Sequence, residues 1–280
     1  MKKITRRSFL AAAGLTAAAL ALTACGGSSS STASSAASSV AASSEAASSS
    51  AAAAELTTVE AGKLTMATNA AFPPYEMTTD AGEFEGIDID TAKAIAEKLG
   101  LELQIDDMDF DAALLSVQQG KADIVMAGVT VTDERKAVMD FSDSYATGIQ
   151  SIIVPEGSDI TSPDDLAGKK IGTQRGTTGY IYCSDDFGDD AVVAYDDGLT
   201  AVQALNNGQV DAVVIDNAPA KEFVAANPGL VILDTSYAEE DYAIGLAKGS
   251  ALEDAVNAAL EELKADGTLQ SIVDKYITAE

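Results

Sequence analysis

Two charged residues of this sequence each follow a short apolar run and could bind the two ends of a small zwitterion. Arg135 closes the segment 128–135, where glycine and threonine expose backbone donors beside a guanidinium that can bind a carboxylate through two hydrogen bonds. Asp216 directly follows the apolar run 212–215, and its carboxylate suits an ammonium group. The two residues can act together only if the fold brings them to one place.

Each of these two residues also has a simpler interpretation. Arg135 could form a local salt bridge with Asp133 or Glu134. Asp216 could cap a following helix with its carboxylate, although the nearby Pro219 favours a turn. The sequence alone leaves these alternatives open.

Two aromatic residues and one glycine–threonine segment could complete such a site. Phe72 lies in a proline-held turn after an apolar run, and Phe110 begins an amphipathic stretch. Their flat faces could sandwich the aliphatic part of a ligand, although both could equally be core residues. The segment 176–179, Gly-Thr-Thr-Gly, precedes an expected helix start at Tyr180 and offers free N–H groups to an anion. Because it lacks the lysine of a Walker motif, it is not a nucleotide loop.

The composition argues against several other kinds of chemistry. The chain has no histidine, so it lacks the imidazole that Ser-His-Asp triads and the usual zinc sites need, and we expect no cofactor and no metal. It carries 17 Lys and Arg against 44 Asp and Glu, a formal net charge of −27, which repels nucleic acid. Of its two cysteines, we expect Cys25 to carry a lipid and Cys183 to be an unpaired, buried hydrophobe.

The first residues resemble an export signal. A basic start precedes an apolar run over 9–21 that is too short to span a bilayer, and the run ends in Leu-Thr-Ala-Cys at 22–25, which resembles a bacterial lipobox. We therefore expect a signal peptide over 1–24, a diacylglycerol on Cys25, and a flexible Ser/Ala-rich tether over 25–58. An ordinary cleaved signal with a chance cysteine is the alternative. The paired Arg6 and Arg7 leave Sec and twin-arginine export open.

From residue 62 onward, short apolar runs alternate with amphipathic stretches, which is typical of α/β folds with parallel sheets. We expect helices over 90–99, 110–119, 200–207, 252–263 and 269–277. We expect strands over 64–68, 101–105, 123–126, 169–173, 211–215 and 242–246. Ser250 is expected to cap the helix at 252–263.

An internal repeat favours two related lobes. When Gly120 is aligned with Gly208, the helix–glycine–strand segments around them superpose, although this unit is common enough for a chance match. Since ligands of open α/β sheets bind beyond the carboxyl ends of the strands, two lobes with facing strand ends would enclose one cleft. We place the first lobe in 59–146 and 242–280 and the second in 147–241, with hinges near 145–149 and 236–242.

The globular region from 62 to 280 resembles the family 3 extracellular solute-binding proteins, the polar amino-acid receptors of ABC importers. Five segments in order carry the resemblance: Phe72-Pro73-Pro74-Tyr75-Glu76, Gly86-Ile87-Asp88-Ile89-Asp90, 128–135 with Met139-Asp140-Phe141-Ser142, 176–179, and 211–216. The resemblance implies an α/β, two-lobe periplasmic-binding-protein-like fold, with a ligand cleft between lobes joined by two hinge strands. It implies a structural role for 86–90, as a turn and the cap of the following helix.

The resemblance also implies roles for individual residues toward an amino-acid ligand. Arg135 would clamp the α-carboxylate, assisted by Thr130 and the amide of Thr177. Asp216 and the carbonyl of Gly128 would hold the α-ammonium. The rest of the ligand would meet two flanking rings and a side-chain pocket, formed by Phe72, Phe110, Asn69, Ala127 and Gln174.

The charge of the side-chain pocket bears on the choice of ligand. Family members for cationic ligands often carry an acidic residue where Asn69 stands, so asparagine favours a neutral polar side chain. Arg175 would further disfavour a cation if it points into the pocket.

These observations together predict a binding protein rather than an enzyme. We expect a monomer, lipid-anchored to the outer face of the cytoplasmic membrane, which closes on a small amino acid and delivers it to an ABC permease. One alternative is an exported enzyme of dehydratase type on the same scaffold, which would need a general acid in the cleft. Another is a ligand-sensing module for a membrane receptor.

Overall fold

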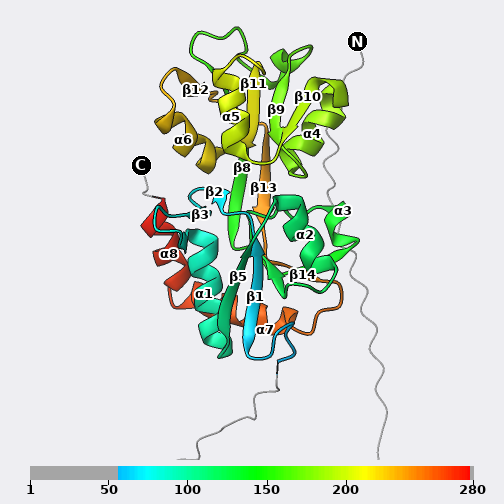
Figure 1. Ribbon diagram of the computed structural model, residues 1–280, viewed down its shortest axis with the longest axis vertical. Helices are drawn as coiled ribbons and strands as arrows, with labels where there is room; N and C mark the ends of the chain where they lie inside the picture. The colour runs from blue at the N-terminus through cyan, green and yellow to red at the C-terminus, as the bar shows by residue number, and fades with distance from the viewer. Residues whose placement is uncertain (1–55, 278–280) are drawn as a thin grey trace, which may run out of the picture. The chain divides into compact units, whose positions relative to one another are not determined.

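The computed structural model describes residues 56–277 of the chain (Figure 1). The predicted signal peptide, Cys25 and most of the predicted tether lie outside these residues. Among the helices of residues 56–277, none combines the length and the hydropathy that a membrane span requires.

The first lobe is built on a five-stranded sheet of order β5-β1-β6-β14-β7. Its strands are β1 (Lys63–Thr68), β5 (Glu102–Asp107), β6 (Ile124–Val125), β7 (Met139–Phe141) and β14 (Gly245–Ala247). Its helices are α1 (Ile87–Leu99), α2 (Phe110–Gln118), α3 (Asp133–Lys136), α7 (Glu253–Ala265) and α8 (Thr268–Tyr276). A small sheet of β2 (Ala71–Phe72), β3 (Glu76–Thr78) and β4 (Phe84–Glu85) adjoins it.

Alternation along β1 explains why helices cover both faces of this sheet. Leu64 and Met66 are fully buried in a cluster with apolar residues of α1 and α7. Ala67 points to the other face and joins a cluster with α2. A strand that is buried on both faces is typical of parallel α/β sheets.

The second lobe has a sheet of order β10-β9-β11-β8-β12. Its strands are β8 (Ala146–Pro155), β9 (Ile171–Gln174), β10 (Val192–Tyr195), β11 (Ala212–Asp216), β12 (Leu230–Ile232) and β13 (Ala238–Tyr242), which pairs with β8. Its helices are α4 (Thr178–Phe187), α5 (Gly198–Asn206) and α6 (Asn217–Ala226), with short 3-10 turns at Pro163–Leu166 and Asp189–Ala191. Cys183 is buried in this lobe, and burial raises the pKa of its thiol to about 12, so little reactive thiolate forms at neutral pH.

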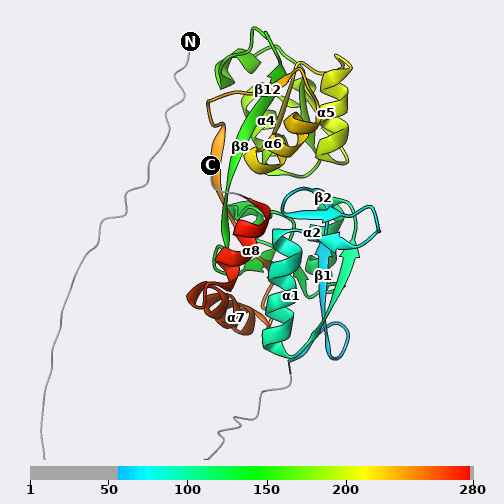
Figure 2. The ribbon, with the colours of Figure 1, turned by 90° about the vertical axis from the view of Figure 1, so that its left-hand side faces the viewer.

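Two antiparallel strands join the lobes. In β8 and β13, Ala146 pairs with Tyr242 and Gln150 pairs with Ala238. Figures 1 and 2 show both strands running between the lobes. The chain then returns to the first sheet, where β14 pairs with β6 and β7. The predicted α/β fold with two lobes and two connecting strands is confirmed.

Two local predictions near the C-terminal end are wrong. The single strand expected over 242–246 is two strands, because Tyr242 ends the pairing with β8 while Gly245 begins the pairing with β6 and β7. Ser250 does not cap α7, whose N-cap is Leu252; the Ser250 hydroxyl instead accepts a hydrogen bond from the amide of Leu252 at 3.2 Å.

We predict that Gly86→Ala strongly destabilises the protein. Gly86 precedes α1 with a φ of 131°, and a Cβ there would lie 2.2 Å from the carbonyl oxygen of Tyr75. Strain of about 1–3 kcal/mol adds to overpacking of about 1–3 kcal/mol, so we expect denaturant unfolding to report a loss of roughly 3–5 kcal/mol. Gly82 also has a positive φ, of 79°, but a Cβ at this position would have no atom within 4 Å. Gly82→Ala should therefore cost only about 1–2 kcal/mol, and equal losses in the two variants would contradict the steric explanation.

Candidate functional site

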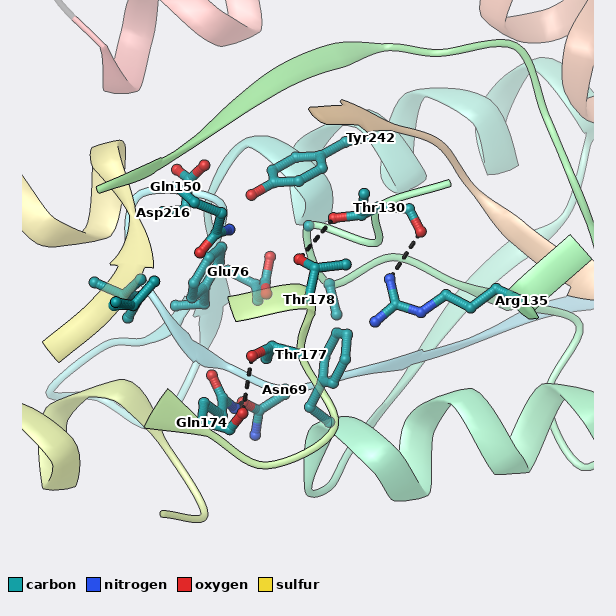
Figure 3. Close-up of a pocket in the computed structure, with 16 residues that line it drawn as sticks. Asn69, Glu76, Thr130, Arg135, Gln150, Gln174, Thr177, Thr178, Asp216 and Tyr242 are labelled. Atoms are coloured by element: carbon teal, nitrogen blue, oxygen red, sulfur yellow. Dashed lines mark hydrogen bonds between the residues drawn. The ribbon is translucent and has the colours of Figure 1, made fainter. Parts of the chain in front are cut away.

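A pocket between the two lobes gathers all ten residues that the sequence proposed as ligand-binding. Asn69, Phe72, Phe110, Ala127, Gly128, Thr130, Arg135, Gln174, Thr177 and Asp216 all line it. Six further residues complete its wall: Glu76, Gln150, Thr178, Val214, Ile215 and Tyr242. Figure 3 shows these side chains converging from elements of both lobes.

Arg135 reaches the pocket from the short helix α3 of the first lobe. Thr132 caps this helix, since its hydroxyl accepts a hydrogen bond from the amide of Arg135 at 3.2 Å. The guanidinium donates to the carbonyl of Thr130 at 2.7 Å and, across the cleft, to the carbonyl of Gly176 at 3.1 Å. It lies 5.4 Å from the centre of the Phe110 ring. Backbone carbonyls thus aim a buried cation without neutralising it.

The alternative of a local salt bridge at Arg135 is not observed. Within residues 56–277, Arg135 forms no ion pair with Asp133 or Glu134. Its side chain is only 8 % exposed, and burial lowers the pKa of the guanidinium, although an arginine remains charged at neutral pH. The carboxylate of Glu240 is near enough to favour the charged form, but it makes no direct ion pair with the guanidinium. A buried cation that is only partly compensated favours an anionic ligand.

Asp216 reaches the same pocket from the second lobe, at the end of β11. Its carboxylate accepts from the amide of Ala218 at 3.0 Å and from the amide of Ile149, in β8, at 2.8 Å. The hydroxyl of Tyr242 donates a further hydrogen bond. Burial outweighs these bonds and raises the pKa of Asp216 to about 6. The carboxylate is therefore mostly ionised at neutral pH and lies where a cation would relieve its desolvation.

The turn expected after Asp216 is wrong. Asp216 is the N-cap of α6, and Pro219 lies in the first turn of that helix, where a proline is tolerated because its missing N–H has no intrahelical partner. Capping and pocket lining are therefore not alternatives, because the carboxylate does both.

The two phenylalanines are also both core and pocket residues. Phe72 packs against the apolar clusters of both lobes and stacks on Tyr75 with ring centres 5.8 Å apart. Phe110 is buried in the first lobe beneath Arg135. Each ring is held by the core on one side and faces the pocket on the other.

Side chains of the two lobes meet at the far end of the pocket. The amide of Gln174, at the end of β9, donates to the side-chain oxygen of Asn69 at 2.8 Å, and Asn69 donates to the carbonyl of Met108 at 3.0 Å. Thr130 and Thr178 lie with their hydroxyls 3.4 Å apart. These contacts bridge the cleft directly.

The glycine–threonine segment begins a helix slightly earlier than predicted. The helix α4 starts at Thr178 rather than at Tyr180, with Thr177 as its N-cap. The amide of Thr177, expected to assist Arg135, makes only a long 3.4 Å contact with the carbonyl of Gln174. Arg175 does not line the pocket; its side chain is 53 % exposed, near Asp196. Its predicted effect on ligand charge therefore does not apply.

Sequence reasoning missed an acidic residue in the pocket. Glu76, in β3, is fully buried, and within residues 56–277 no N–H or hydroxyl group donates a hydrogen bond to its carboxylate oxygens. Burial is the main reason that the pKa of the Glu76 carboxyl lies well above its usual range, and the neighbouring Asp88 raises it further. The only signal in the sequence was an acidic residue immediately after the Phe-Pro-Pro-Tyr turn, and the motif gave it no separate role.

The segment 86–90 is more than a turn and a cap. Gly86 occupies the N-cap position of α1, but no side chain caps this helix. The carboxylate of Asp88 instead points into the lobe, where it accepts from the amide of Gly128 at 3.0 Å and from the hydroxyl of Tyr145 at 2.7 Å. Asp88 thus supports a pocket residue from behind.

Comparison with known proteins identifies the group to which this chain belongs. The model of the bacterial extracellular solute-binding proteins, family 3, matches residues 64–279. The chain belongs to this family. The predicted resemblance is thereby confirmed, and the family consists of solute-binding proteins rather than enzymes.

Three proteins that are similar to this chain have names that give different amino-acid ligands. The L-cystine-binding protein TcyJ of Escherichia coli K12 is 33% identical over 226 residues, which cover 79% of this chain and 85% of that protein. An ancestral arginine-binding protein bound to glutamine is 43% identical, with a TM-score of 0.74 over 78% of this chain and 99% of that one. An ancestral arginine-binding protein bound to arginine has 43% identity and a TM-score of 0.73, over 77% and 98%.

Proposed function

We propose that this family 3 protein is the extracytoplasmic substrate-binding lipoprotein of an ABC importer and closes its lobes on one polar amino acid. One observation carries the proposal: a buried arginine that forms no ion pair within residues 56–277 and a buried aspartate, from opposite lobes, line one pocket. An α-amino acid supplies the two complementary charges. The amino acids that the names of the relatives give as ligands support it.

In this proposal the ligand's α-carboxylate binds Arg135, with Thr130 and the amide of Thr177. Its α-ammonium binds Asp216 and the carbonyl of Gly128. Phe72 and Phe110 flank its aliphatic part, and its side chain lies toward Asn69, Ala127 and Gln174. The lobes, proposed as 59–146 with 242–280 and 147–241, would rotate about β8 and β13 to admit and release it.

The side chain of the ligand has two candidates. Asn69 favours a neutral polar side chain such as the carboxamide of glutamine, because it carries no charge. Glu76 is buried, and within residues 56–277 no group donates a hydrogen bond to its carboxylate oxygens. Such a carboxylate favours a cationic side chain such as guanidinium. Ancestral arginine-binding proteins are bound to glutamine in one structure and to arginine in the other, which supports both candidate side chains.

The proposal has three further parts: the lipid anchor, the monomeric state and the absence of catalysis. The lipobox at 22–25 supports a lipid anchor at Cys25 on the outer face of the cytoplasmic membrane. A single cleft formed within one chain supports a monomer. The binding roles of Arg135 and Asp216, together with membership of a family of solute-binding proteins, argue against an enzyme.

A panel of free amino acids tests the function. A ligand present at 100 times its dissociation constant stabilises the folded protein by about 2.7 kcal/mol, so a few polar amino acids should raise the melting temperature and the rest should not. If no amino acid shifts the melting temperature while a larger acid is converted to product, the dehydratase-like enzyme becomes the better description. Binding without uptake through any permease would favour the sensory module.

We predict that Glu76→Gln separates the two ligand candidates. A hydrogen bond to a charged group contributes about 1.5–3 kcal/mol, so titration calorimetry should show arginine affinity falling about 10- to 150-fold in this variant. Glutamine affinity should change less than about threefold, because an amide at 76 can still accept from a carboxamide. The exposed Glu83, in the loop after β3, provides the control variant Glu83→Gln. Unchanged arginine affinity in Glu76→Gln would exclude Glu76 as the cation's partner.

A further inference from the structure

Glu76, which lines the pocket, has a second acidic side chain, Asp88, next to it behind the pocket wall. Glu76 comes from β3 and Asp88 from the first turn of α1, and both side chains are fully buried. The amide of Asp88 donates to the carbonyl of Tyr75, the residue before Glu76, at 2.8 Å. Both Glu76 oxygens and Asp88 Oδ1 are buried without another partner in residues 56–277, and the two carboxyl groups raise or lower each other's pKa as neighbours do. Figure 3 shows the Glu76 side chain among pocket residues of both lobes.

The surroundings of this pair contain no compensating cation. The titratable groups that act on it are the hydroxyls of Tyr75 and Tyr145 and the carboxyl of Asp107. Within residues 56–277, neither Glu76 nor Asp88 forms an ion pair with lysine or arginine. Two adjacent buried carboxyl groups cannot both remain ionised, so one holds a proton that it donates to the other.

The hydrogen bonds of Asp88 decide which group keeps the proton. Asp88 accepts from the amide of Gly128 at 3.0 Å and from the hydroxyl of Tyr145 at 2.7 Å, and both bonds favour its ionised form. Within residues 56–277, no group donates a hydrogen bond to Glu76. These contacts favour Glu76 as the group that keeps the proton.

Asp88 also connects Glu76 to the pocket loop and to the connecting strands. Gly128 has a φ of 55°, and a Cβ there would lie 2.9 Å from the Phe72 ring, so its backbone is closely fitted. Tyr145 directly precedes β8, and its amide donates to the carbonyl of Tyr242, at the end of β13. One carboxylate thus binds the pocket loop at Gly128 and, through Tyr145, adjoins the start of β8 and the end of β13.

We propose that Asp88 is a positioning residue that shares one proton with Glu76, so that a cationic ligand side chain enters the pocket by displacing this proton to solvent. The inference rests on the proposed function of the same pocket. A guanidinium takes over the positive charge that the proton supplied, Glu76 becomes a carboxylate, and Asp88 keeps its bonds to Gly128 and Tyr145. A neutral carboxamide leaves the proton in place.

The first arm of the test needs no ligand. A folded state that retains a proton lost by the unfolded chain becomes less stable as pH rises above the ordinary carboxyl range, with about a tenfold change in the unfolding equilibrium constant per pH unit and proton. Wild-type protein, Asp88→Asn, Glu76→Gln and the exposed α1 control Glu97→Gln are unfolded with denaturant at several pH values. We expect the pH dependence of the unfolding free energy in Glu97→Gln to match that of wild type. In Glu76→Gln this dependence should be smaller by one proton, because the carboxyl that retains the proton is absent. In Asp88→Asn, whose amide can donate to a Glu76 carboxylate, the dependence should end at least one pH unit lower.

The second arm measures protons released on binding, by calorimetry in two buffers of different ionisation enthalpy. Wild type should release close to one proton on binding arginine and none on binding glutamine, while Asp88→Asn should release much less than one with arginine.

An Asp88→Asn profile identical to wild type in the first arm would overturn the shared proton. If the first arm succeeds and no amino acid gives a binding heat, the proton pair stands and the proposed function fails. If Asp88→Asn does not fold, Glu76→Gln decides, and a wild-type pH dependence in that variant would overturn the inference.

Discussion

Replacing Arg135 by alanine is expected to weaken amino-acid binding by at least about 30-fold while leaving the protein folded. The guanidinium is buried and is aimed by two backbone carbonyls, and no carboxylate of residues 56–277 pairs with it. Removing one partner of a buried, hydrogen-bonded charge pair costs about 2–5 kcal/mol, so the dissociation constant should rise by roughly 30- to 4,000-fold. Titration calorimetry with the amino acid that gives the largest thermal shift measures this change.

Arg175→Ala is the matched control for this experiment. Arg175 precedes the same glycine–threonine segment, but its side chain is 53 % exposed and contacts Asp196 at 3.5 Å. Removal of an exposed charge of this kind should change affinity less than about threefold. Arg135→Lys keeps the charge but cannot form two parallel bonds, so it should bind more weakly than wild type and more tightly than Arg135→Ala. Normal binding by Arg135→Ala would remove Arg135 from the site.

Asp216→Asn is expected to weaken binding and, at the same time, to stabilise the protein at neutral pH. An amide cannot neutralise the ligand's ammonium, so affinity should fall by about 2–4 kcal/mol. Burial raises the pKa of the folded carboxyl from 3.8 to about 6. The folded state therefore binds more protons than the unfolded chain between these values, and stability falls as pH rises from about 4 to about 6. Above that window the ionised carboxylate costs roughly 3 kcal/mol, part of which asparagine should recover.

Denaturant unfolding at two pH values checks this second effect. At pH 8 we expect Asp216→Asn to be about 1–2 kcal/mol more stable than wild type, since asparagine avoids the buried charge but has only one acceptor oxygen for Ile149 and Ala218. Near pH 4 the difference should vanish, because the carboxyl is protonated. Asp234→Asn, at an exposed position of the same lobe, should differ little from wild type at either pH. A variant that loses stability at pH 8 would show that the bonds of Asp216 outweigh its desolvation.

These expectations describe a site whose charges are held in unfavourable surroundings. Arg135 and Asp216 are both buried, and burial shifts the pKa of each toward its neutral form. Surrounding backbone groups and Tyr242 hold the side chains in place while leaving their charges only partly compensated. A ligand that supplies the opposite charges would be bound tightly for the same reason that the isolated site is destabilising.

The pocket could be predicted from sequence because of where its residues lie along the chain. Ala127 and Gly128 follow β6, Gln174 ends β9 and Asp216 ends β11. Carboxyl ends of parallel strands meet at one edge of a sheet, so local patterns were enough to place these residues at the cleft. The family resemblance then supplied their roles.

Other features depended on contacts between distant segments. Glu76 looked like part of a turn motif until β3 buried it beside Asp88, which lies on a different element. Gln150 and Tyr242 line the pocket only because β8 and β13 pair along the hinge. The strand expected over 242–246 was divided by the same pairing, since each half belongs to a different sheet.

The opposing charges at Arg135 and Asp216, the alternating α/β pattern and the lipobox could all be recognised in the sequence, because each depends on residue type and local spacing. Tertiary structure alone decided that Arg135 has no local ion pair, that Asp216 both caps α6 and lines the pocket, and that Glu76 lies buried against Asp88. These facts depend on burial and on partners far away in sequence, and burial is what changes the energy of a charge.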